Sequence, residues 1–444
     1  MLGNVSGKVV TGSIDDARTQ ALLKRRYQSL GQWTPLFYRQ PLHIVRGEDV
    51  WMWDADGRKY LDVYNNVPCV GHCHPRVVEA ITKQAATLNI HTRYLHENIV
   101  EYAERLTAKF DDPLNMLMFA CTGSEANDIA LRMARHHTGK QGIIVTDLAY
   151  HGNTEAVSEL GSAFMPEAQT TRRVKTFPIP DSYHALDGLS GEALADAYAE
   201  RIKSVIDEFE EEGIGLAGIM ICPAFTNEGF VDVPPGFMDK AMSYVRAAGG
   251  LYIADEIQGG FGRTGHQWWS HQAEGVIPDI VTLGKSMGNG HPISGVVTSP
   301  ELIDEFGPWG MYFNTFAGNP VSCAAAMAVL DVLDEENLLD NAVQVGAHLA
   351  EGLRNLQTKY ECIGDVRDKG LFLAVELVTD RETRAPATDL AGQVINLMRN
   401  KGVLISCIGR HNNILKMRPP MTFATEHAML LLETLAECFN ELEA

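Results

Sequence analysis

The sequence has few of the features that mark secreted or nucleic-acid-binding proteins. It contains eight cysteines in 444 residues, too few for a disulfide framework and typical of reduced thiols in the cytoplasm. Its 37 basic residues are outnumbered by 57 acidic ones, and a formal net charge of −20 argues against nucleic acid or an anionic membrane as a partner. We therefore expect a protein of the cytoplasm.

Long apolar segments are also missing. Residues 1–11 contain no apolar run of the length found in secretory signals. The longest uncharged stretch, residues 307–330, contains Pro308, Asn314, Asn319 and Pro320, so it is not expected to span a membrane. Repeats and low-complexity tracts are absent. A chain of this length with 45% hydrophobic residues indicates two or three domains around a large core.

The middle of the chain has the pattern of an α/β domain. From about residue 75 to 335, helical segments alternate with short apolar runs, which predicts a mostly parallel sheet with covering helices. We expect a large domain over residues 76–335. The expected strands lie at residues 116–120, 142–146, 216–221, 251–254, 280–283 and 295–298.

The two ends of the chain predict a smaller α+β domain. Residues 15–35 are typical of a loose helix, and residues 50–63 of a hairpin around an Asp-Gly turn. Beyond residue 335 we expect a long helix, a second helix and short strands near 370–376, 402–406 and 414–417. Residues 1–75 and 336–444 are therefore predicted to lie outside the large domain and to form the smaller one.

Asp255 and Lys285 carry the clearest chemical signal. Each follows an apolar run, so both are expected at the ends of buried strands, facing one crevice of the sheet. Pyridoxal phosphate requires such a pair, because a lysine forms a Schiff base with its aldehyde and an acid keeps its ring nitrogen protonated. At ~4 Å and an effective dielectric of ~20, that ion pair is worth roughly 4 kcal/mol. The structural alternative is a turn-capping aspartate and a surface lysine.

Two further motifs follow expected strands. Gly123 and Ser124 open a helix, whose N-terminal amides form an anion site suited to a cofactor phosphate, although the same residues suit a simple helix cap. Tyr150 and His151 follow the next strand. A tyrosine there stacks on a flat ring or simply fills the core, and His151 is its neighbour.

Two other patterns are weaker. Residues 260–265 fit a glycine-rich dinucleotide motif, but the sequence that follows lacks the apolar periodicity of the required helix. Cys69, His72, Cys73 and His74 are potential zinc ligands, but their spacing is compressed and no second pair is present. We therefore expect neither an oxidoreductase using a dinucleotide nor a metal site.

In combination, the motifs resemble those of class III, omega-type, aminotransferases, which are fold-type-I pyridoxal phosphate enzymes. The resemblance implies a large domain with a mostly parallel sheet and a smaller α+β domain built from both termini. It covers nearly the whole chain. The residues that carry it are 56–62, 71–75, 122–127, 150–152, 254–258, 260–265, Lys285, 313–320 and 418–420.

The resemblance also implies roles for residues around the cofactor ring. Lys285 is the expected Schiff-base lysine, and Asp255 the partner of the pyridine nitrogen. Tyr150 is expected to stack on the ring with His151 beside it, and Gln258 to lie near the cofactor hydroxyl. All five are expected to bind the cofactor.

A second group of implied contacts involves the cofactor phosphate. Gly123 and Ser124 are expected to hold it from within the same chain. Thr315 is expected to contact the phosphate of a neighbouring subunit. The resemblance therefore implies a homodimer with shared active sites.

The chain departs from the family pattern on the substrate side. An arginine often stands three residues before the double proline, and here the position is Lys416, with Glu228 as its expected partner. Lysine lacks the bidentate geometry of arginine, so Arg410 is a possible substitute for binding a carboxylate. Residues 92–98 and 414–417 also resemble the phospho-lyase branch of the family.

The sequence favours transamination from an amine or amino acid to a keto acid by a ping-pong mechanism. Asn66 and Tyr94 lie in stretches expected to line the substrate side, and amide groups suit an uncharged substrate portion better than a phosphate. Glu228 is expected to mask Lys416. Elimination of phosphate from an O-phosphorylated amine is the alternative, since it uses the same cofactor.

Overall fold

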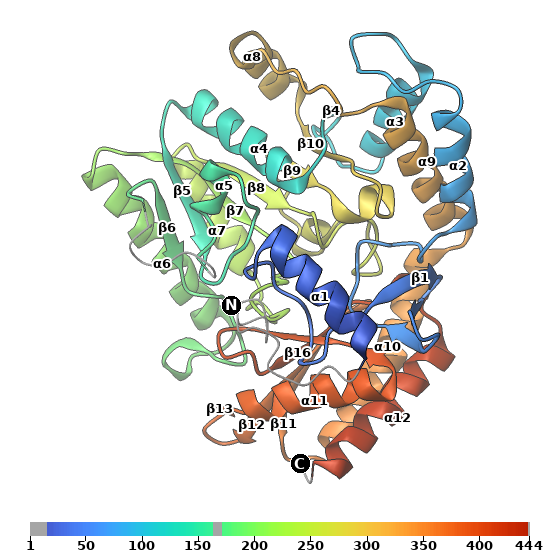
Figure 1. Cartoon of the computed structure of the whole chain (residues 1–444). Coiled ribbons are helices and arrows are strands. Elements are labelled where there is room, and N and C mark those ends of the chain that lie inside the picture. Colours follow the sequence, from blue (N-terminus) through green and yellow to red (C-terminus); the bar gives the residue numbers. More distant parts are fainter. Residues whose placement is uncertain (1–15, 163–170, 443–444) are drawn as a thin grey trace.

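The computed structural model describes residues 16–162 and 171–442 (Figure 1). Residues 1–11, where the sequence shows no secretory signal, lie outside these ranges. The helices are α1 Ala17–Leu30, α2 Pro75–Ala85, α3 Glu97–Thr107, α4 Gly123–Thr138, α5 Glu155–Ser158, α6 Gly191–Glu211, α7 Phe237–Ala247, α8 Pro300–Gly310, α9 Pro320–Glu335, α10 Leu338–Gln357, α11 Thr388–Lys401 and α12 Thr425–Glu441. The strands are β1 Ile44–Glu48, β2 Trp51–Asp54, β3 Lys59–Asp62, β4 Met116–Ala120, β5 Gly142–Thr146, β6 Val174–Phe177, β7 Leu216–Ile221, β8 Leu251–Asp255, β9 Ile280–Leu283, β10 Ser294–Thr298, β11 Ile363–Lys369, β12 Phe372–Asp380, β13 Ala385–Pro386, β14 Val403–Leu404, β15 Ser406–Ile408 and β16 Ile414–Met417.

A seven-stranded sheet forms the centre of the molecule, in the order β4-β10-β9-β8-β7-β5-β6. Strands β9, β8, β7, β5 and β6 are parallel, which confirms the predicted α/β architecture. Strand β10 runs antiparallel to both β9 and β4. Every residue of β5, β7, β9 and β10 is buried, because helices cover both faces of a parallel sheet.

Successive residues of these strands point to opposite faces and enter different apolar clusters. Ile143 and Val145 of β5 pack in the cluster of α4, whereas Ile144 packs in the cluster that contains α6 and α7. In Figure 1, α4 lies on the near side of the sheet, and α6 and α7 lie at its lower left edge. Because these helices cover the two faces of the sheet, the ends of its strands are the part that they leave uncovered.

The two ends of the chain meet in the smaller part of the molecule. Strands β1, β2, β3 and β14 form one sheet, in which β14 pairs parallel with β3. A second sheet has the order β11-β12-β16-β15, with β13 paired to β12. Helices α10, α11 and α12 lie beside these sheets in the lower part of Figure 1. The exact domain boundaries at residues 75 and 335 stay a prediction.

Among the described residues, none of the helices combines the length and the apolar character that crossing a bilayer requires. The uncharged stretch at 307–330 folds instead as the end of α8, a loop and most of α9.

Candidate active site

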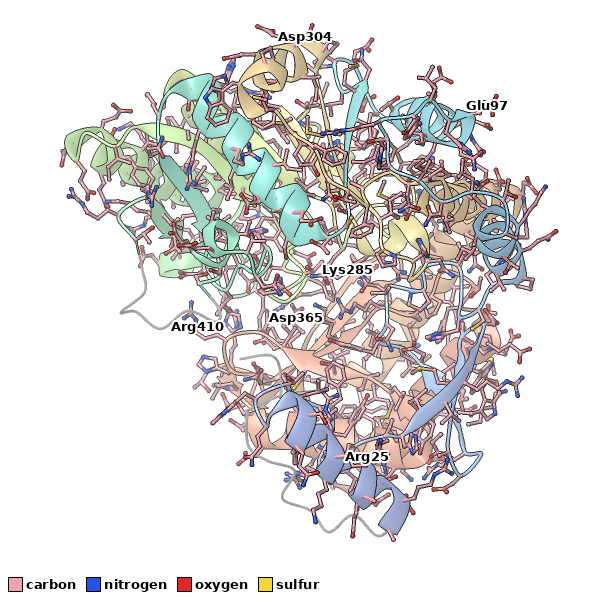
Figure 2. All side chains as sticks on the ribbon, turned by 45° about the horizontal axis from the view of Figure 1, so that its top comes forward. Arg25, Glu97, Lys285, Asp304, Asp365 and Arg410 are labelled. Atoms are coloured by element: carbon pink, nitrogen blue, oxygen red, sulfur yellow. The ribbon has the colours of Figure 1, made fainter. Side chains whose placement is uncertain are left out.

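Asp255 and Lys285 lie at the carboxyl ends of neighbouring parallel strands. Asp255 is the last residue of β8 and pairs in register with Thr282 of β9, and Lys285 follows β9 after Gly284. The backbone of Lys285 has a φ of 37°, a left-handed conformation that is strained for a residue with a side chain. Figure 2 shows Lys285 near the middle of the molecule. The sheet therefore brings the predicted pair together.

The carboxylate of Asp255 is buried and held by three donors. Oδ2 lies 2.6 Å from Nδ1 of His151 and accepts a hydrogen bond of 3.1 Å from Nδ2 of Asn127. Oδ1 accepts only the backbone N–H of Ile257, at 3.1 Å. Oδ1 therefore retains acceptor capacity for a ring N–H, and the other contacts fix the orientation of the carboxylate.

The amine of Lys285 is shifted toward its neutral form. Burial lowers its pKa from 10.5 to about 8, and the positive charge of Arg418 acts in the same direction. Asp255 and Cys222 oppose this shift by favouring the ammonium form. At pH 7 roughly one tenth of this amine is thus neutral and able to react with an aldehyde, far more than for an exposed lysine.

The N-terminus of α4 lies beside this pair. Thr122 and Glu125 form a capping box, so the first turn of the helix is fixed. Ser124 Oγ donates to Oδ1 of Asn153 at 3.0 Å and accepts from the backbone N–H of Asn153 at 3.1 Å. A Cβ added at Gly152 would lie 2.5 Å from Ser124 Oγ. The loop after β5 therefore packs directly on an anion-binding helix terminus.

Tyr150 and Gln258 lie on the loops around the same strand ends. Tyr150 is partly exposed at 37%, and its backbone carbonyl accepts from Nδ2 of Asn227 at 3.3 Å. Gln258 is buried, and its Oε1 accepts a hydrogen bond from Nη1 of Arg418. Arg418 belongs to the family motif at residues 418–420, but no role is assigned to it from the sequence. Its contact joins residues far apart in the chain, so no local pattern indicates it.

Asn66 is buried with an unused donor. Its backbone carbonyl accepts from Oγ of Ser286, the residue after Lys285, at 3.3 Å. Its side-chain Nδ2 is inaccessible to solvent and has no hydrogen-bond partner among the residues that the structure describes. Because a buried amide rarely lacks a partner, this donor indicates a position for a ligand acceptor near the lysine.

The expected ion pair between Lys416 and Glu228 is not formed. Nζ of the buried Lys416 donates to the backbone carbonyl of Thr226 at 2.7 Å and lies 5.2 Å from the ring centroid of Phe230. Glu228 instead accepts from Oγ1 of Thr146 at 2.5 Å. The family resemblance implied the pairing of these two residues, but nearby backbone and hydroxyl groups satisfy each of them separately.

Burial shifts both side chains toward neutrality. The pKa of Lys416 lies well below the usual lysine value, mainly through burial and then through the charge of Arg418. Burial likewise raises the pKa of Glu228. Within the described ranges, Lys416 forms no ion pair with a carboxylate, so the expected ion pair is wrong, but the charge of Glu228 still opposes the fall in the pKa of Lys416.

The remaining predicted residues lie further out. Arg410 is exposed, with Nη2 3.3 Å from Oδ2 of Asp147, and it lines a cavity of about 250 Å³ that Glu228 also lines. Figure 2 shows it below and to the left of Lys285. Tyr94 is 60% exposed, and Thr315 is exposed on the loop before α9. Within one chain, the last two are surface residues.

The two weaker motifs have structural contacts. His72 Nε2 lies 2.7 Å from Oδ2 of Asp62, and Cys69 donates to the sulfur of Met421. No group of three potential metal ligands converges in the part of the chain that the structure describes. The glycine-rich loop at 260–265 is followed by turns and the short 3₁₀ helix Ser270–Glu274 rather than by a long helix.

These features fit pyridoxal phosphate. The site offers an amine with a lowered pKa, a buried carboxylate with a free acceptor position, and a helix N-terminus suited to a phosphate. Together with the sheet topology, they define a fold-type-I pyridoxal phosphate enzyme.

Residues 37–439 match the class III aminotransferase family, and the chain belongs to that family. Two relatives carry different names. An alanine–glyoxylate aminotransferase 2-like protein of Drosophila melanogaster is 42% identical over 94% of this chain and 86% of its own length. An ethanolamine-phosphate phospho-lyase homolog of Caenorhabditis elegans is 39% identical over 91% of this chain and 90% of its own length.

A solved structure is also similar. A phospholyase from Arthrobacter, in complex with phosphoethanolamine, is 45% identical and has a TM-score of 0.92. The match covers 94% of this chain and 99% of that chain. Members of the family depend on pyridoxal phosphate, which is therefore the cofactor of this enzyme.

Proposed function

We propose that this enzyme eliminates phosphate from an O-phosphorylated amine. The observation that carries the proposal is the buried side chain of Lys416, which has no carboxylate partner in the described ranges and lies within electrostatic reach of Lys285. A phosphate group supplies the anion that such a buried amine lacks. The similarity to a phospholyase with bound phosphoethanolamine supports the same substrate class.

The residues around the strand ends take the cofactor roles in this proposal. Lys285 holds the cofactor aldehyde, and Asp255 holds the ring nitrogen protonated through Oδ1. His151 orients Asp255 through the 2.6 Å contact. Tyr150 stacks on the ring, and Gln258 lies beside its hydroxyl group.

The cofactor phosphate binds at the N-terminus of α4. Gly123 and Ser124 contribute their backbone N–H groups, and the helix dipole favours the negative charge. A Cβ at Gly123 would lie 2.6 Å from Cδ1 of Ile257, so the backbone here is closely packed against the loop after Asp255. This packing fixes the distance between the phosphate and ring positions.

The chain's own residues then perform the reaction. Bound pyridoxal phosphate withdraws electrons from the substrate carbon that carries the amine. Once the substrate amine has replaced it on the cofactor aldehyde, the freed amine of Lys285 removes the proton from that carbon, because its lowered pKa makes it a base near neutral pH. The bond between the neighbouring carbon and the phosphate oxygen breaks with its electron pair on oxygen. Water then converts the organic product to an aldehyde and ammonia.

Lys416 and Asn66 serve the leaving phosphate. The amine of Lys416 is protonated as the phosphate binds, and the resulting cation stabilises the charge that develops on the leaving oxygen. The unpartnered Nδ2 of Asn66 donates to the same group. Tyr94, Glu228 and Arg410 border the substrate side, with Glu228 and Arg410 on one cavity wall.

The test is an assay with O-phosphoethanolamine and no keto acid. We expect repeated turnovers that release inorganic phosphate and ammonia in equal amounts. Lys416→Met should lower phosphate release at least about tenfold, since hydrogen bonds to charged groups contribute roughly 1.5–3 kcal/mol. Lys416→Arg retains the charge and should retain more activity. Phosphate release that depends on a keto acid, or none at all, would overturn the proposal.

Transamination is the second candidate. The Drosophila relative, at 42% identity, is named for an alanine–glyoxylate aminotransferase. Exposed Arg410 offers a cation for a substrate carboxylate, provided that it leaves Asp147. In this case an amine or amino acid would give up its amino group in one half-reaction, and a keto acid would accept it in the other, by a ping-pong mechanism. Consumption of alanine that requires glyoxylate or pyruvate would favour this function.

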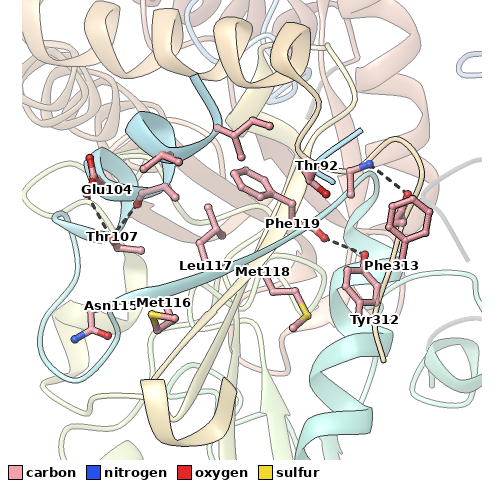
Figure 3. A pocket seen from close by; sticks show the side chains of 15 residues that line it. Thr92, Glu104, Thr107, Asn115, Met116, Leu117, Met118, Phe119, Tyr312 and Phe313 are labelled. Atoms are coloured by element: carbon pink, nitrogen blue, oxygen red, sulfur yellow. Dashed lines mark hydrogen bonds between the residues drawn. The ribbon is translucent and has the colours of Figure 1, made fainter. Parts of the chain in front are cut away.

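We also propose a homodimer, because apolar side chains gather on one face. Leu95 is fully exposed, Met311 is 85% exposed and Phe316 is 72% exposed. A cavity of about 510 Å³ opens on this face between α3, β4 and the loop before α9, with Phe119 and Tyr312 on its walls (Figure 3). A second copy of the chain that covers this face brings Thr315 toward the cofactor phosphate of its partner.

The cytoplasm remains the proposed location. All eight cysteines have free thiols, as expected where cellular reductants keep thiols reduced.

A further inference from the structure

Arg418 is held at one end of the site by two segments of the chain, residues 63–64 and Gln258. Its backbone N–H donates to the carbonyl of Val63 at 2.8 Å, and its Nε donates to the carbonyl of Tyr64 at 2.8 Å. The guanidinium carbon lies 4.4 Å from the ring centroid of Tyr64. Nη1 donates to Oε1 of Gln258. These contacts fix the guanidinium in one orientation.

The charge of Arg418 has no negative partner in the described part of the chain. Its polar contacts are a backbone carbonyl and an amide oxygen, and both are neutral. The side chain is buried, and residue exposure is only 8%. Burying a guanidinium without a carboxylate costs free energy. We therefore expect its positive charge to act on a nearby group.

We propose that Arg418 is a positioning residue of the cofactor site. It orients the amide of Gln258 toward the cofactor hydroxyl and places an uncompensated positive charge beside Lys285. The first part rests on the proposed position of Gln258. Neither part depends on whether the enzyme is a lyase or a transaminase.

The orientation follows from the donor and acceptor inventory of an amide. Oε1 of Gln258 already accepts from Arg418, so the two N–H donors of Nε2 remain for another group. A cofactor hydroxyl that has lost its proton is an acceptor and suits these donors. Without Arg418 the amide of Gln258 is free to turn. Its Oε1 would then face the oxygen of the cofactor hydroxyl, and both of these atoms are acceptors.

Arg418 lies near Lys285, because the carbonyl of Tyr64 accepts from Arg418 and the carbonyl of Asn66, two residues further on, accepts from Ser286, the neighbour of Lys285. The charged or titratable groups that influence this amine are Asp255, Cys222 and Arg418, and Lys416 lies close enough to interact with it. Asp255 and Cys222 raise its pKa, whereas Arg418 lowers it. Removing the positive charge should therefore raise the pKa of Lys285 and reduce the fraction of free amine at neutral pH.

The first experiment measures capture of pyridoxal phosphate by the cofactor-free enzyme, without substrate. Capture requires a free amine, so its rate increases with pH around the pKa of Lys285. Arg418→Met should move the midpoint up by about one pH unit, the lower end of the shift that a nearby charge produces. Arg418→Lys keeps the charge and should stay within a few tenths of a unit. Lys203→Met removes an exposed cation on α6 and should change nothing.

The second experiment tests orientation through a double-mutant cycle. The visible absorbance of the bound cofactor is titrated with pH in Gln258→Leu, in Arg418→Met and in the double variant. If Arg418 acts on the hydroxyl through Gln258, the spectral effects of the two changes are not additive. Additive shifts would overturn the positioning role, and an unchanged capture midpoint in Arg418→Met would overturn the electrostatic role.

Thermal unfolding of each cofactor-free variant checks that it is folded. Should Arg418→Met fail to fold, Arg418→Gln replaces it, because it removes the charge and keeps a donor for Oε1 of Gln258. With that variant the capture midpoint should still rise, and the orientation of Gln258 should be partly restored. A capture midpoint equal to that of the wild type would again overturn the electrostatic role.

Discussion

Nδ1 of His151 lies 2.6 Å from Oδ2 of Asp255, and both side chains are almost fully buried. His151 lies on the loop after β5, and Asp255 is the last residue of β8. A second donor, Nδ2 of Asn127, fixes the same oxygen. The carboxylate therefore enters the reaction already oriented, with Oδ1 directed to the remaining partner.

Asp255→Asn should leave the cofactor bound and slow proton removal from the substrate about 10²- to 10³-fold. An amide cannot balance a protonated ring nitrogen, and the lost ion pair is worth roughly 4 kcal/mol at most. The measurement is the single-turnover decay of the cofactor's visible absorbance after a good amine is added. His151→Gln keeps a donor to Asp255 and should cost less. Decay near the wild-type rate in Asp255→Asn would exclude this role.

Lys285→Met should abolish turnover and stabilise the cofactor-free enzyme at pH 7. Lys285 has a pKa of about 8 in the fold against 10.5 when unfolded, so below pH 8 the fold carries the full cost of the buried ammonium. That cost disappears as pH rises from about 8 to 10.5, because only the unfolded chain then holds the proton. The predicted gain at pH 7 is up to about 3 kcal/mol.

Denaturant unfolding of the wild type and Lys285→Met at several pH values measures this difference. Other titrating groups cancel between the two proteins, so the difference should shrink from pH 8 upward. A difference that stays constant with pH would contradict the predicted shift of Lys285. Turnover of amines by the variant at the wild-type rate would contradict its assignment as the central lysine.

The sequence predicted the elements that carry this site because each has a strong local pattern. The apolar runs of β8 and β9 identify the strands, and the residues that follow them identify the crevice. Strand β16 was expected at 414–417 and forms there. Strands β6 and β11 were missed, because Val174–Phe177 lies at the sheet edge and Ile363–Lys369 carries several charges. Edge strands need little apolar sequence.

Contacts between distant segments were harder to predict. The family resemblance paired Glu228 with Lys416, but the structure shows that Glu228 accepts from Thr146 and that Lys416 donates to the carbonyl of Thr226. Arg418 was part of a family motif, yet its contact with Gln258 depends on how two loops pack. Which groups form a hydrogen bond depends on distances of a few ångströms between polar atoms. The spacing of residues along the sequence does not specify those distances.

Gly152→Ala should weaken cofactor binding about ten- to hundredfold. The added Cβ would lie 2.5 Å from Ser124 Oγ and 2.9 Å from its Cα, so the loop after β5 must move off the N-terminus of α4. Overpacking of this kind costs roughly 1–3 kcal/mol. Titration of the cofactor-free protein with pyridoxal phosphate measures the affinity.

Gly139→Ala is the matched control for that change. Gly139 also has a positive φ, of 66°, but no atom lies within 4 Å of the added Cβ. It should lower stability by about 1 kcal/mol through backbone strain and leave the cofactor affinity unchanged. Equal loss of affinity in both variants would mean that strain, and not the contact with Ser124, is responsible.

Leu95→Asp should convert the proposed dimer to an inactive monomer. Leu95 is fully exposed in a single chain, next to the apolar face that includes Phe316. A buried aspartate without a partner is costly at an interface. Light scattering at the assay concentration gives the mass. Met429→Asp replaces a half-exposed residue on α12 and should stay dimeric. A fully active monomeric wild type would refute the shared active site.

Lys416 should take up a proton when a phosphate group binds. Its pKa lies well below the usual lysine value because of burial, so the free site favours the neutral amine. A bound phosphate dianion favours the charged form and raises that pKa, which draws a proton from the buffer. Calorimetric titration of the cofactor-loaded enzyme with inorganic phosphate, in buffers with different ionisation enthalpies, counts the protons.

Phosphate itself can also take up a proton when it binds. Comparing the wild type with variants of Lys416 distinguishes that proton from the one taken up by the lysine. The wild type should take up as much as one proton more than Lys416→Met, in which binding should also weaken at least about tenfold. Lys416→Arg should bind phosphate without taking up the extra proton, because an arginine side chain is already charged near neutral pH. Equal proton uptake in all three proteins would show that Lys416 does not meet the phosphate. In that case Arg410, which lines the neighbouring cavity, becomes the cation to test, and transamination becomes the better account of the site.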